Sequence, residues 1–210
     1  MPYGSDTAGA EGEEKMNWNV LVTGVGGEGV LVTSVILSRA ANHEGYEVRG
    51  TQLHGLAQRG GAIPAHVRFG TRVYSPLIPR GQADLIFALE PLEAARFCYF
   101  ASREKTHFLV DTYPMMPVYA NLLGQPYPSY EKIKAMIEPF AKKEIFIDAS
   151  NICFRKLGDA VYGNVMMLGV ALAKGMLPLK KESIIQAIKA TIKEPEKDMQ
   201  AFRMGLDYRG

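Results

Sequence analysis

An apolar run, a glycine-rich turn and a helical repeat follow one another within residues 19–50. Residues 19–23 are apolar and strand-length, Gly24-Val-Gly-Gly-Glu-Gly29 follows at once, and residues 30–41 carry apolar and small side chains at helical spacing. Glu47–Gly50 begins a second strand after Gly45, which ends the helix. A strand, tight turn, helix and strand of this length form a βαβ unit. The order predicts an α/β protein with a parallel sheet.

The rest of the chain continues the alternation of strands and helices. Residues 63–69 alternate apolar with polar side chains, and Pro64 favours an edge strand or a bulge because proline lacks the N–H of a ladder bond. Continuous apolar runs, typical of strands covered on both faces, occupy residues 85–89, 107–110 and 145–147. Helical spacing returns in residues 160–174, 183–192 and 199–206. We therefore predict a Rossmann-like α/β fold of three layers, with a mostly parallel sheet, one irregular or edge strand and a helical C-terminal third.

Length and composition limit the class of protein. With 210 residues and 47% hydrophobic content, the chain can bury a full core. Residues 1–15 are small, acidic and aperiodic, so we exclude them as a leader or tag and expect residues 16–210 to form a single domain. No membrane-length apolar run or secretory signal occurs, which predicts a cytoplasmic protein. A net charge of +2 indicates neither a nucleic-acid nor a membrane partner.

The glycine turn is a candidate cofactor-binding site. Gly24, Gly26 and Gly29, with Gly27 between them, fit a phosphate loop placed between a strand and a helix. Arg49 stands where NAD-binding proteins carry an acid, which suits the 2′-phosphate of NADP better. Alternatively, the glycines serve only the tight turn and close helix packing.

A second segment, residues 54–61, is predicted to be a binding or interface site. His54, Gln58 and Arg59 stand beside Gly60 and Gly61, and paired glycines let a backbone approach another surface while arginine grips phosphate or carboxylate. The alternative is a solvated polar loop. Acid–base catalysis by His54 is disfavoured, since no acid or nucleophile is paired with it in sequence. We therefore assign no catalytic residue.

Three predicted strands are each followed by an acid: Glu90, Asp111 and Asp148. Such acids border the ligand crevice of α/β sheets, but capping of the next helix is the favoured interpretation, with Asp148 or Ser150 ahead of residues 151–157. The two cysteines, Cys98 and Cys153, are far apart and predict neither a disulfide framework nor a metal or cluster site.

Six segments in this order resemble the gamma-type domain of 2-oxoacid:ferredoxin oxidoreductases. The likeness spans residues 18–206 and is strongest to the members that oxidise arylpyruvates. Glu28 departs from the glutamine more usual there, which weakens the case for an anionic ligand at the turn. The segments are Gly24-Val-Gly-Gly-Glu-Gly-Val30, His54-Gly-Leu-Ala-Gln-Arg-Gly-Gly61, His66-Val-Arg68, Tyr74-Ser-Pro-Leu-Ile-Pro79 with Gly81 and Ala83-Asp84, Leu89-Glu-Pro-Leu-Glu-Ala94 and Asn164-Val-Met-Met-Leu-Gly169.

The resemblance implies ferredoxin-dependent oxidative decarboxylation. An arylpyruvate such as indolepyruvate, with coenzyme A and oxidised ferredoxin, gives arylacetyl-CoA, carbon dioxide and reduced ferredoxin. An alpha subunit is implied to hold thiamine diphosphate, [4Fe-4S] clusters and coenzyme A, and this chain is implied to be a required subunit that is inactive alone. The sequence agrees, because Gly158-Asp159 is followed by Ala160 rather than by the glycine of a Gly-Asp-Gly thiamine signature.

Several alternatives stay open at this point. Pyruvate, 2-oxoisovalerate and 2-oxoglutarate are alternative substrates within the same family. An NADP-binding oxidoreductase and a free-standing nucleotide-binding module are alternatives of another class.

Overall fold

The computed structural model describes residues 17–27, 29–52, 61–115, 124 and 126–209. The strands are β1 (Asn17–Val25), β2 (Glu47–Gln52), β3 (Ala62–Gly70), β4 (Leu85–Ala88), β5 (His107–Asp111) and β6 (Lys143–Ile147). The α-helices are α1 (Val30–His43), α2 (Pro91–Arg96), α4 (Tyr130–Ile137), α5 (Ala149–Leu157), α6 (Gly163–Ala173), α7 (Lys181–Thr191) and α8 (Glu196–Leu206). Short 3-10 helices are η1 (Cys98–Phe100), η2 (Glu138–Phe140) and η3 (Ala160–Tyr162).

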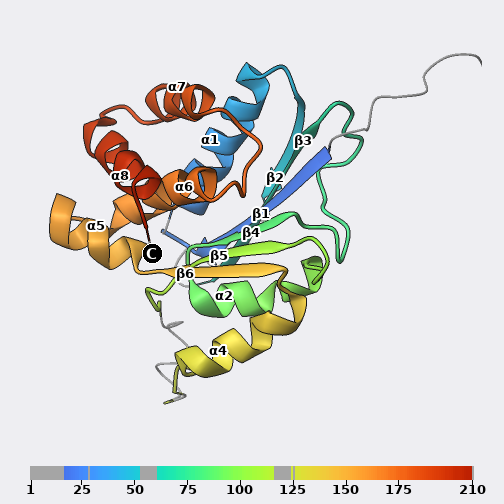
Figure 1. Cartoon of the computed structure of the whole chain (residues 1–210), viewed down its shortest axis with the longest axis vertical. Coiled ribbons are helices and arrows are strands. Elements are labelled where there is room, and N and C mark those ends of the chain that lie inside the picture. The colour runs from blue at the N-terminus through green and yellow to red at the C-terminus, as the bar shows by residue number, and fades with distance from the viewer. Residues whose placement is uncertain (1–16, 28, 53–60, 116–123, 125, 210) are drawn as a thin grey trace, which may run out of the picture.

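The strands form one sheet in the order β2-β3-β1-β4-β5-β6 (Figure 1). β1, β4, β5 and β6 pair in parallel, whereas β3 is antiparallel to both β1 and β2. Of the described strands, β3 alone is therefore reversed. The predicted α/β fold with a mostly parallel sheet and a helical C-terminal third is confirmed.

The predicted edge position of the strand that contains Pro64 is wrong. β3 lies between β2 and β1 and pairs with β1 along all nine of its residues, without an irregularity. The last described pair with β2 joins Gln52 to Ala65, so Pro64 lies one residue beyond that ladder. Because no β2 partner stands opposite Pro64 in the described ladder, its missing N–H removes no bond there. β2 is consequently not a neighbour of β1, although the two strands are parallel.

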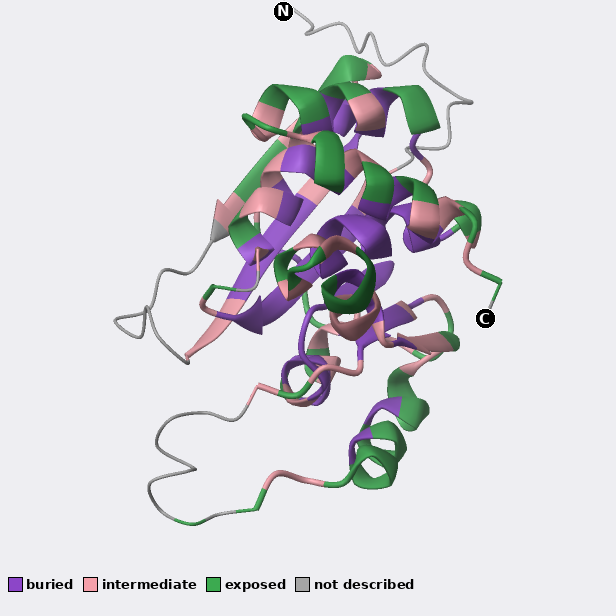
Figure 2. Cartoon of the chain, turned by 90° about the vertical axis from the view of Figure 1, so that its left-hand side faces the viewer, coloured by how far each residue is buried: buried purple, intermediate pink, exposed green. Residues whose placement is uncertain are grey.

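Helices cover both faces of the sheet (Figure 1). α1, α6, α7 and α8 lie over one face, and α2 and α4 lie over the other. Successive residues of β1 point to opposite faces. Val20 and Val22 therefore join the core beneath α1 and α6, while Leu21 joins the core beneath α2 and α4. Figure 2 shows the buried strands and the buried α6 between more exposed helices. The three predicted layers are present.

α6 is the central helix of the C-terminal third, and each of its residues from Gly163 to Ala171 is buried. α8 packs against α6 at two glycines, Gly169 of α6 and Gly205 of α8. A Cβ atom on Gly205 would lie 3.0 Å from Cα of Gly169 and 2.9 Å from the carbonyl carbon of Met166. The two backbones are therefore in direct contact, and α8 is held between α5 and α7 (Figure 1).

The parallel strands bring their carboxyl ends to one edge of the sheet. The chain leaves β1 for α1 on one face and leaves the neighbouring β4 for α2 on the opposite face. Ligand sites in open α/β sheets form outside the carboxyl ends of two strands whose connections diverge in this way. The topology therefore directs attention to the space beyond β1 and β4.

Candidate functional site

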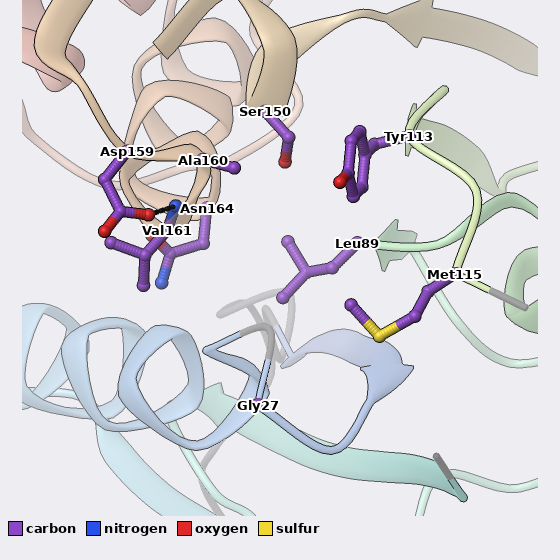
Figure 3. A pocket seen from close by; sticks show the side chains of 9 residues that line it. All are labelled: Gly27, Leu89, Tyr113, Met115, Ser150, Asp159, Ala160, Val161 and Asn164. Carbon is purple, nitrogen blue, oxygen red and sulfur yellow. Dashed lines mark hydrogen bonds between the residues drawn. The ribbon is translucent and has the colours of Figure 1, made fainter. Parts of the chain in front are cut away.

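A pocket of about 230 Å³ opens at this edge (Figure 3). Its residues come from the glycine turn after β1, from the segments that follow β4 and β5, and from α5, η3 and α6. Hydroxyl, carboxylate and amide groups share the lining with apolar side chains, a composition typical of small-molecule sites. The lining residues are Gly27, Leu89, Tyr113, Met115, Ser150, Asp159, Ala160, Val161 and Asn164.

The predicted glycine turn forms one wall of the pocket, but its glycines have different roles. Gly24 belongs to β1, where it pairs with Ile63 of β3. Gly27 has a φ of 107° and lines the pocket, and a Cβ atom added to it would have nothing within 4 Å. Gly29 has a φ of 89° and is the N-cap of α1, where no side chain caps the helix. The turn therefore presents an uncapped helix N-terminus beside the pocket, an arrangement that favours anions.

Asn164 joins this turn to the start of α6. Its amide Nδ2 donates to the carbonyl oxygen of Gly29 at 3.5 Å, and its Oδ1 accepts from the N–H of Val165 at 2.7 Å. A Cβ atom on Gly29 would lie 3.0 Å from Cγ of Asn164. Gly29 is thus required both by its left-handed backbone and by the close approach of Asn164.

A buried carboxylate, Asp111, hydrogen-bonds to two residues that line the pocket, Ser150 and Tyr113. Asp111 accepts from the N–H and Oγ of Ser150 at 3.0 and 2.7 Å and from the N–H of Tyr113 at 3.2 Å. Burial raises the pKa of Asp111 to about 6, and these hydrogen bonds limit the rise. Asp111 thereby caps α5 from the neighbouring strand. The predicted side-chain capping by Asp148 or Ser150 is wrong. Asp148 holds the N-cap position, but its side chain binds those of Asn151 and Arg155 and no N–H of the helix backbone, and the hydroxyl of Ser150 donates to Asp111.

Glu90 is a second buried carboxylate at this edge. It caps α2 by accepting from the N–H of Glu93 at 2.9 Å, so the predicted capping role is confirmed. It also accepts from the N–H of Met115 at 3.3 Å and from the hydroxyl of Tyr127. Burial raises the pKa of Glu90, and these donors oppose the rise. Glu90 therefore ties the segment after β5 to the start of α2, beside the pocket.

His66 and Arg68 of β3 form hydrogen bonds with the segment that follows this strand. Nδ1 of the buried His66 accepts from the N–H of Ile78 at 3.2 Å. Arg68 donates to Oδ1 of Asn19 at 2.7 Å and to the carbonyl oxygen of Ser75 at 2.9 Å. These bonds hold residues 71–79 against β3 and β1, so their role is structural.

Most of the predicted contact segment lies outside the described residues. This applies to His54, Gln58, Arg59 and Gly60. Gly61 is described and partly buried, and it directly precedes β3, whose first residue pairs with the end of β1. Gly61 therefore lies at the edge of the sheet where the pocket opens.

The predicted 2′-phosphate role of Arg49 is wrong. β3 separates β2 from β1, and Arg49 pairs with Arg68 of β3 rather than with a residue of β1, the strand that leads into the glycine turn. Its guanidinium donates to Glu47 at 2.9 Å and to the carbonyl oxygen of Val73 at 3.3 Å. The insertion of β3 removes the strand neighbour on which the ribose contact of a dinucleotide site depends.

Sequence reasoning did not place several residues of the pocket in a binding site. Tyr113 and Met115 follow β5, and Ser150 stands in the first turn of α5. The position of Ser150 ahead of residues 151–157 was a signal for capping, and Asn164 opened one of the six quoted segments. No local pattern distinguishes Tyr113 or Met115 from ordinary loop residues.

Comparison with known proteins gives one consistent result. Residues 19–208 match the family described as pyruvate ferredoxin/flavodoxin oxidoreductase. The chain is 34% identical over 192 residues to the indolepyruvate oxidoreductase subunit IorB of Pyrococcus horikoshii, covering 90% of this chain and 94% of that one. It is 36% identical over 194 residues to the IorB of Archaeoglobus fulgidus, covering 91% and 95%.

A solved structure has the same fold. The gamma subunit of a keto/oxoacid ferredoxin oxidoreductase from Geobacter sulfurreducens superposes with a TM-score of 0.63 at 22% identity, covering 90% of this chain and 96% of that chain. Within the described residues, no helix is long and apolar enough to cross a membrane.

Proposed function

This chain belongs to the pyruvate ferredoxin/flavodoxin oxidoreductase family, and we propose that it is the smaller subunit of an enzyme that oxidises arylpyruvates such as indolepyruvate. The observation that carries the proposal is its identity of 34–36% to two indolepyruvate oxidoreductase subunits along nearly the whole of both chains. The alignments cover at least 90% of this chain and of each relative, so the similarity extends over whole subunits and is not limited to a shared fragment. Pyruvate, 2-oxoisovalerate and 2-oxoglutarate are the competing substrates within the family.

The proposed reaction is a two-electron oxidation. The arylpyruvate loses carbon dioxide and its acyl carbon forms a thioester with coenzyme A, while two oxidised ferredoxins each accept one electron and one proton is released. Thiamine diphosphate supplies the carbanion sink and iron–sulfur clusters carry the electrons. We propose that an alpha subunit holds these groups.

The cysteines of this chain do not fit as ligands of a [4Fe-4S] cluster. Such a cluster takes four thiolates, whereas the chain has two cysteines. Cys153 is buried, with its Sγ 3.7 Å from Sδ of Met166, and burial raises the pKa of its thiol to about 12. A thiol of this kind resists the ionisation that metal binding requires. We therefore propose no electron transfer through a group bound by this chain.

The pocket and the contact segment are proposed to face the alpha subunit. Gly61 and the start of β3 stand beside the end of β1, next to the pocket wall formed by Gly27. We propose that Gly24, Gly26, Gly27 and Gly29 shape a turn whose open amides receive an anionic group, such as a phosphate of coenzyme A. His54, Gln58, Arg59, Gly60 and Gly61 are proposed to contact the partner or substrate.

The test is reconstitution with the alpha subunit from the same organism. We expect no turnover from this chain alone, and indolepyruvate-dependent ferredoxin reduction by the assembled complex when coenzyme A is present. Activity of the isolated chain with thiamine diphosphate and ferredoxin would overturn the subunit role. A complex with a higher kcat/KM for pyruvate, 2-oxoisovalerate or 2-oxoglutarate would keep that role and overturn the proposed substrate.

A further inference from the structure

Two grooves flank the C-terminal end of α8, away from the pocket described above. The first lies between α5 and α8 and has a volume of about 710 Å³. The second lies between α7 and α8 and has a volume of about 500 Å³. Residues of α8 line both grooves, and α8 lies between α5 and α7 (Figure 1).

Basic side chains line the first groove over an apolar floor. Arg155, Lys156 and Arg209 are exposed along its sides, while Met166 is 2% exposed and Met204 is half-buried. Arg155 pairs with Asp148 at 3.3 Å. Lys156 and Arg209 form no ion pair within the described part of the chain.

The second groove repeats this composition. Lys181, Lys189 and Arg203 are exposed along its sides, and none has an ion pair among the described residues. The floor contains the fully buried Phe202 and the half-buried Met199. Asp207 lines both grooves and is their one described acid. Six basic groups thus line the two grooves beside Asp207, and five of the six have no ion pair among the described residues.

Charge and composition define what this surface fits. Methionine, aromatic and arginine side chains are typical of the centre of a protein interface, and a cationic surface is complementary to carboxylates. The cations are spread on both sides of a helix of 11 residues, which rises about 16 Å, so no single small anion reaches them all. The apolar floors favour a protein segment over nucleic acid, which would leave them uncovered.

We propose that α8 and its two grooves form a docking surface for an acidic segment of the alpha subunit. Apolar side chains of that segment fill the two floors, and its carboxylates pair with the basic groups on either side of α8. The inference rests on the proposed function, because it takes the alpha subunit as the partner. It adds a second contact area, formed by the C-terminal helices rather than by residues 54–61.

The test uses charge reversal in the complete chain, co-expressed with the alpha subunit. The variants are Lys156→Glu with Arg209→Glu in the first groove, and Lys189→Glu with Arg203→Glu in the second. The matched control is Lys132→Glu with Lys142→Glu, two exposed lysines that lie in α4 and directly before β6. Dissociation constants are measured at low and at physiological salt, and melting temperatures verify that each variant folds.

We expect each groove variant to weaken assembly about tenfold or more and to reduce its salt dependence, with the control unchanged. Turnover at saturating alpha subunit should be retained, because the variants affect docking alone. Wild-type dissociation constants in all folded variants would overturn this inference and leave the proposed function standing. Absence of assembly by the wild-type chain would overturn the proposed function itself. RNA binding that the same reversals abolish, with assembly unchanged, would also overturn the inference.

Discussion

Gly29 and Asn164 fit so closely that a Cβ atom on Gly29 would lie 3.0 Å from Cγ of the asparagine. The two residues are 135 positions apart, and the amide of Asn164 donates to the carbonyl oxygen of Gly29 at 3.5 Å. Their contact fixes the N-terminus of α1 against that of α6, at the wall of the pocket. Two separate requirements therefore act on Gly29: a positive φ and a small volume.

Gly29→Ala should lower the free energy of unfolding by about 2–4 kcal/mol, through backbone strain together with the clash against Asn164. Gly27→Ala is the matched control, because Gly27 also has a positive φ but has nothing within 4 Å of its added Cβ. Strain alone should cost that variant about 1–2 kcal/mol. Urea unfolding followed by circular dichroism measures both, and equal losses would contradict the packing role of Asn164.

Gly205→Ala should destabilise the protein although it places a better helix former in α8. In an exposed helix the same change gains about 1 kcal/mol. Here the added Cβ would lie 2.9 Å from the carbonyl carbon of Met166, and moving two helix backbones apart should cost about 2–3 kcal/mol net. Gln200→Ala, at an exposed position of the same helix, is the control and should be nearly neutral. A more stable Gly205→Ala variant would exclude the close helix contact.

Asp111 should make stability fall as pH rises from about 4 to about 6. Its pKa is 3.8 as an ordinary carboxyl and is raised to about 6 by burial in the folded protein. Between these values the folded protein keeps a proton that the unfolded chain has released. The free energy of unfolding therefore decreases as pH rises, by about 3 kcal/mol in total. Below the lower pKa and above the higher one, both states bind equal numbers of protons at this group, so its contribution is constant.

The measurement is urea unfolding at a series of pH values. Asp111→Asn should lose this part of the slope, whereas Asp207→Asn, at an exposed position, should keep it. Parallel stability curves for the wild type and Asp111→Asn would show that the carboxyl ionises normally in the folded protein.

Arg68→Lys should lower the free energy of unfolding by about 1–2 kcal/mol despite keeping the charge. The guanidinium bridges Oδ1 of Asn19 and the carbonyl oxygens of Ser75 and Leu77, at 2.7, 2.9 and 3.1 Å, a geometry that an ammonium group does not reproduce. Arg72→Lys is the control, because Arg72 lies over the exposed ring of Tyr74. Hydrogen exchange of residues 71–79 should rise in Arg68→Lys alone. Equal exchange in both variants would argue that the hydrogen bonds of Arg68 do not hold this segment.

Arg59→Ala should weaken assembly with the alpha subunit or lower turnover of the complex by about tenfold. The melting temperature of the isolated chain should stay nearly unchanged, since the proposed role is contact with a partner. Arg72→Ala serves as a surface control for the loss of an arginine. Unaltered assembly and turnover would remove Arg59 from the proposed interface.

Local pattern was sufficient for the elements and the fold class. The apolar runs of β4, β5 and β6 and the helical spacing of α1, α6 and α7 each depend on residues near in sequence. The acid after β4 was likewise correctly predicted to cap a helix, because capping acts within one turn. The family resemblance also depended on the sequence alone, through six short segments in a fixed order.

Long-range pairing decided the rest. Pro64 indicated an edge strand, yet β3 lies between β2 and β1, because its partners are chosen by hydrogen bonding across the sheet and no local signal encodes that choice. Because β3 lies between β2 and β1, Arg49 of β2 is also not adjacent to the strand that carries the glycine turn. Asp111 caps α5, although Asp148 or Ser150 was predicted to do so. The sequence by itself determined which residues form strands, helices and the glycine turn, since those depend on neighbours. Only the tertiary structure brought Gly27, Ser150 and Asn164 to one pocket, because packing and strand order set distances between remote residues.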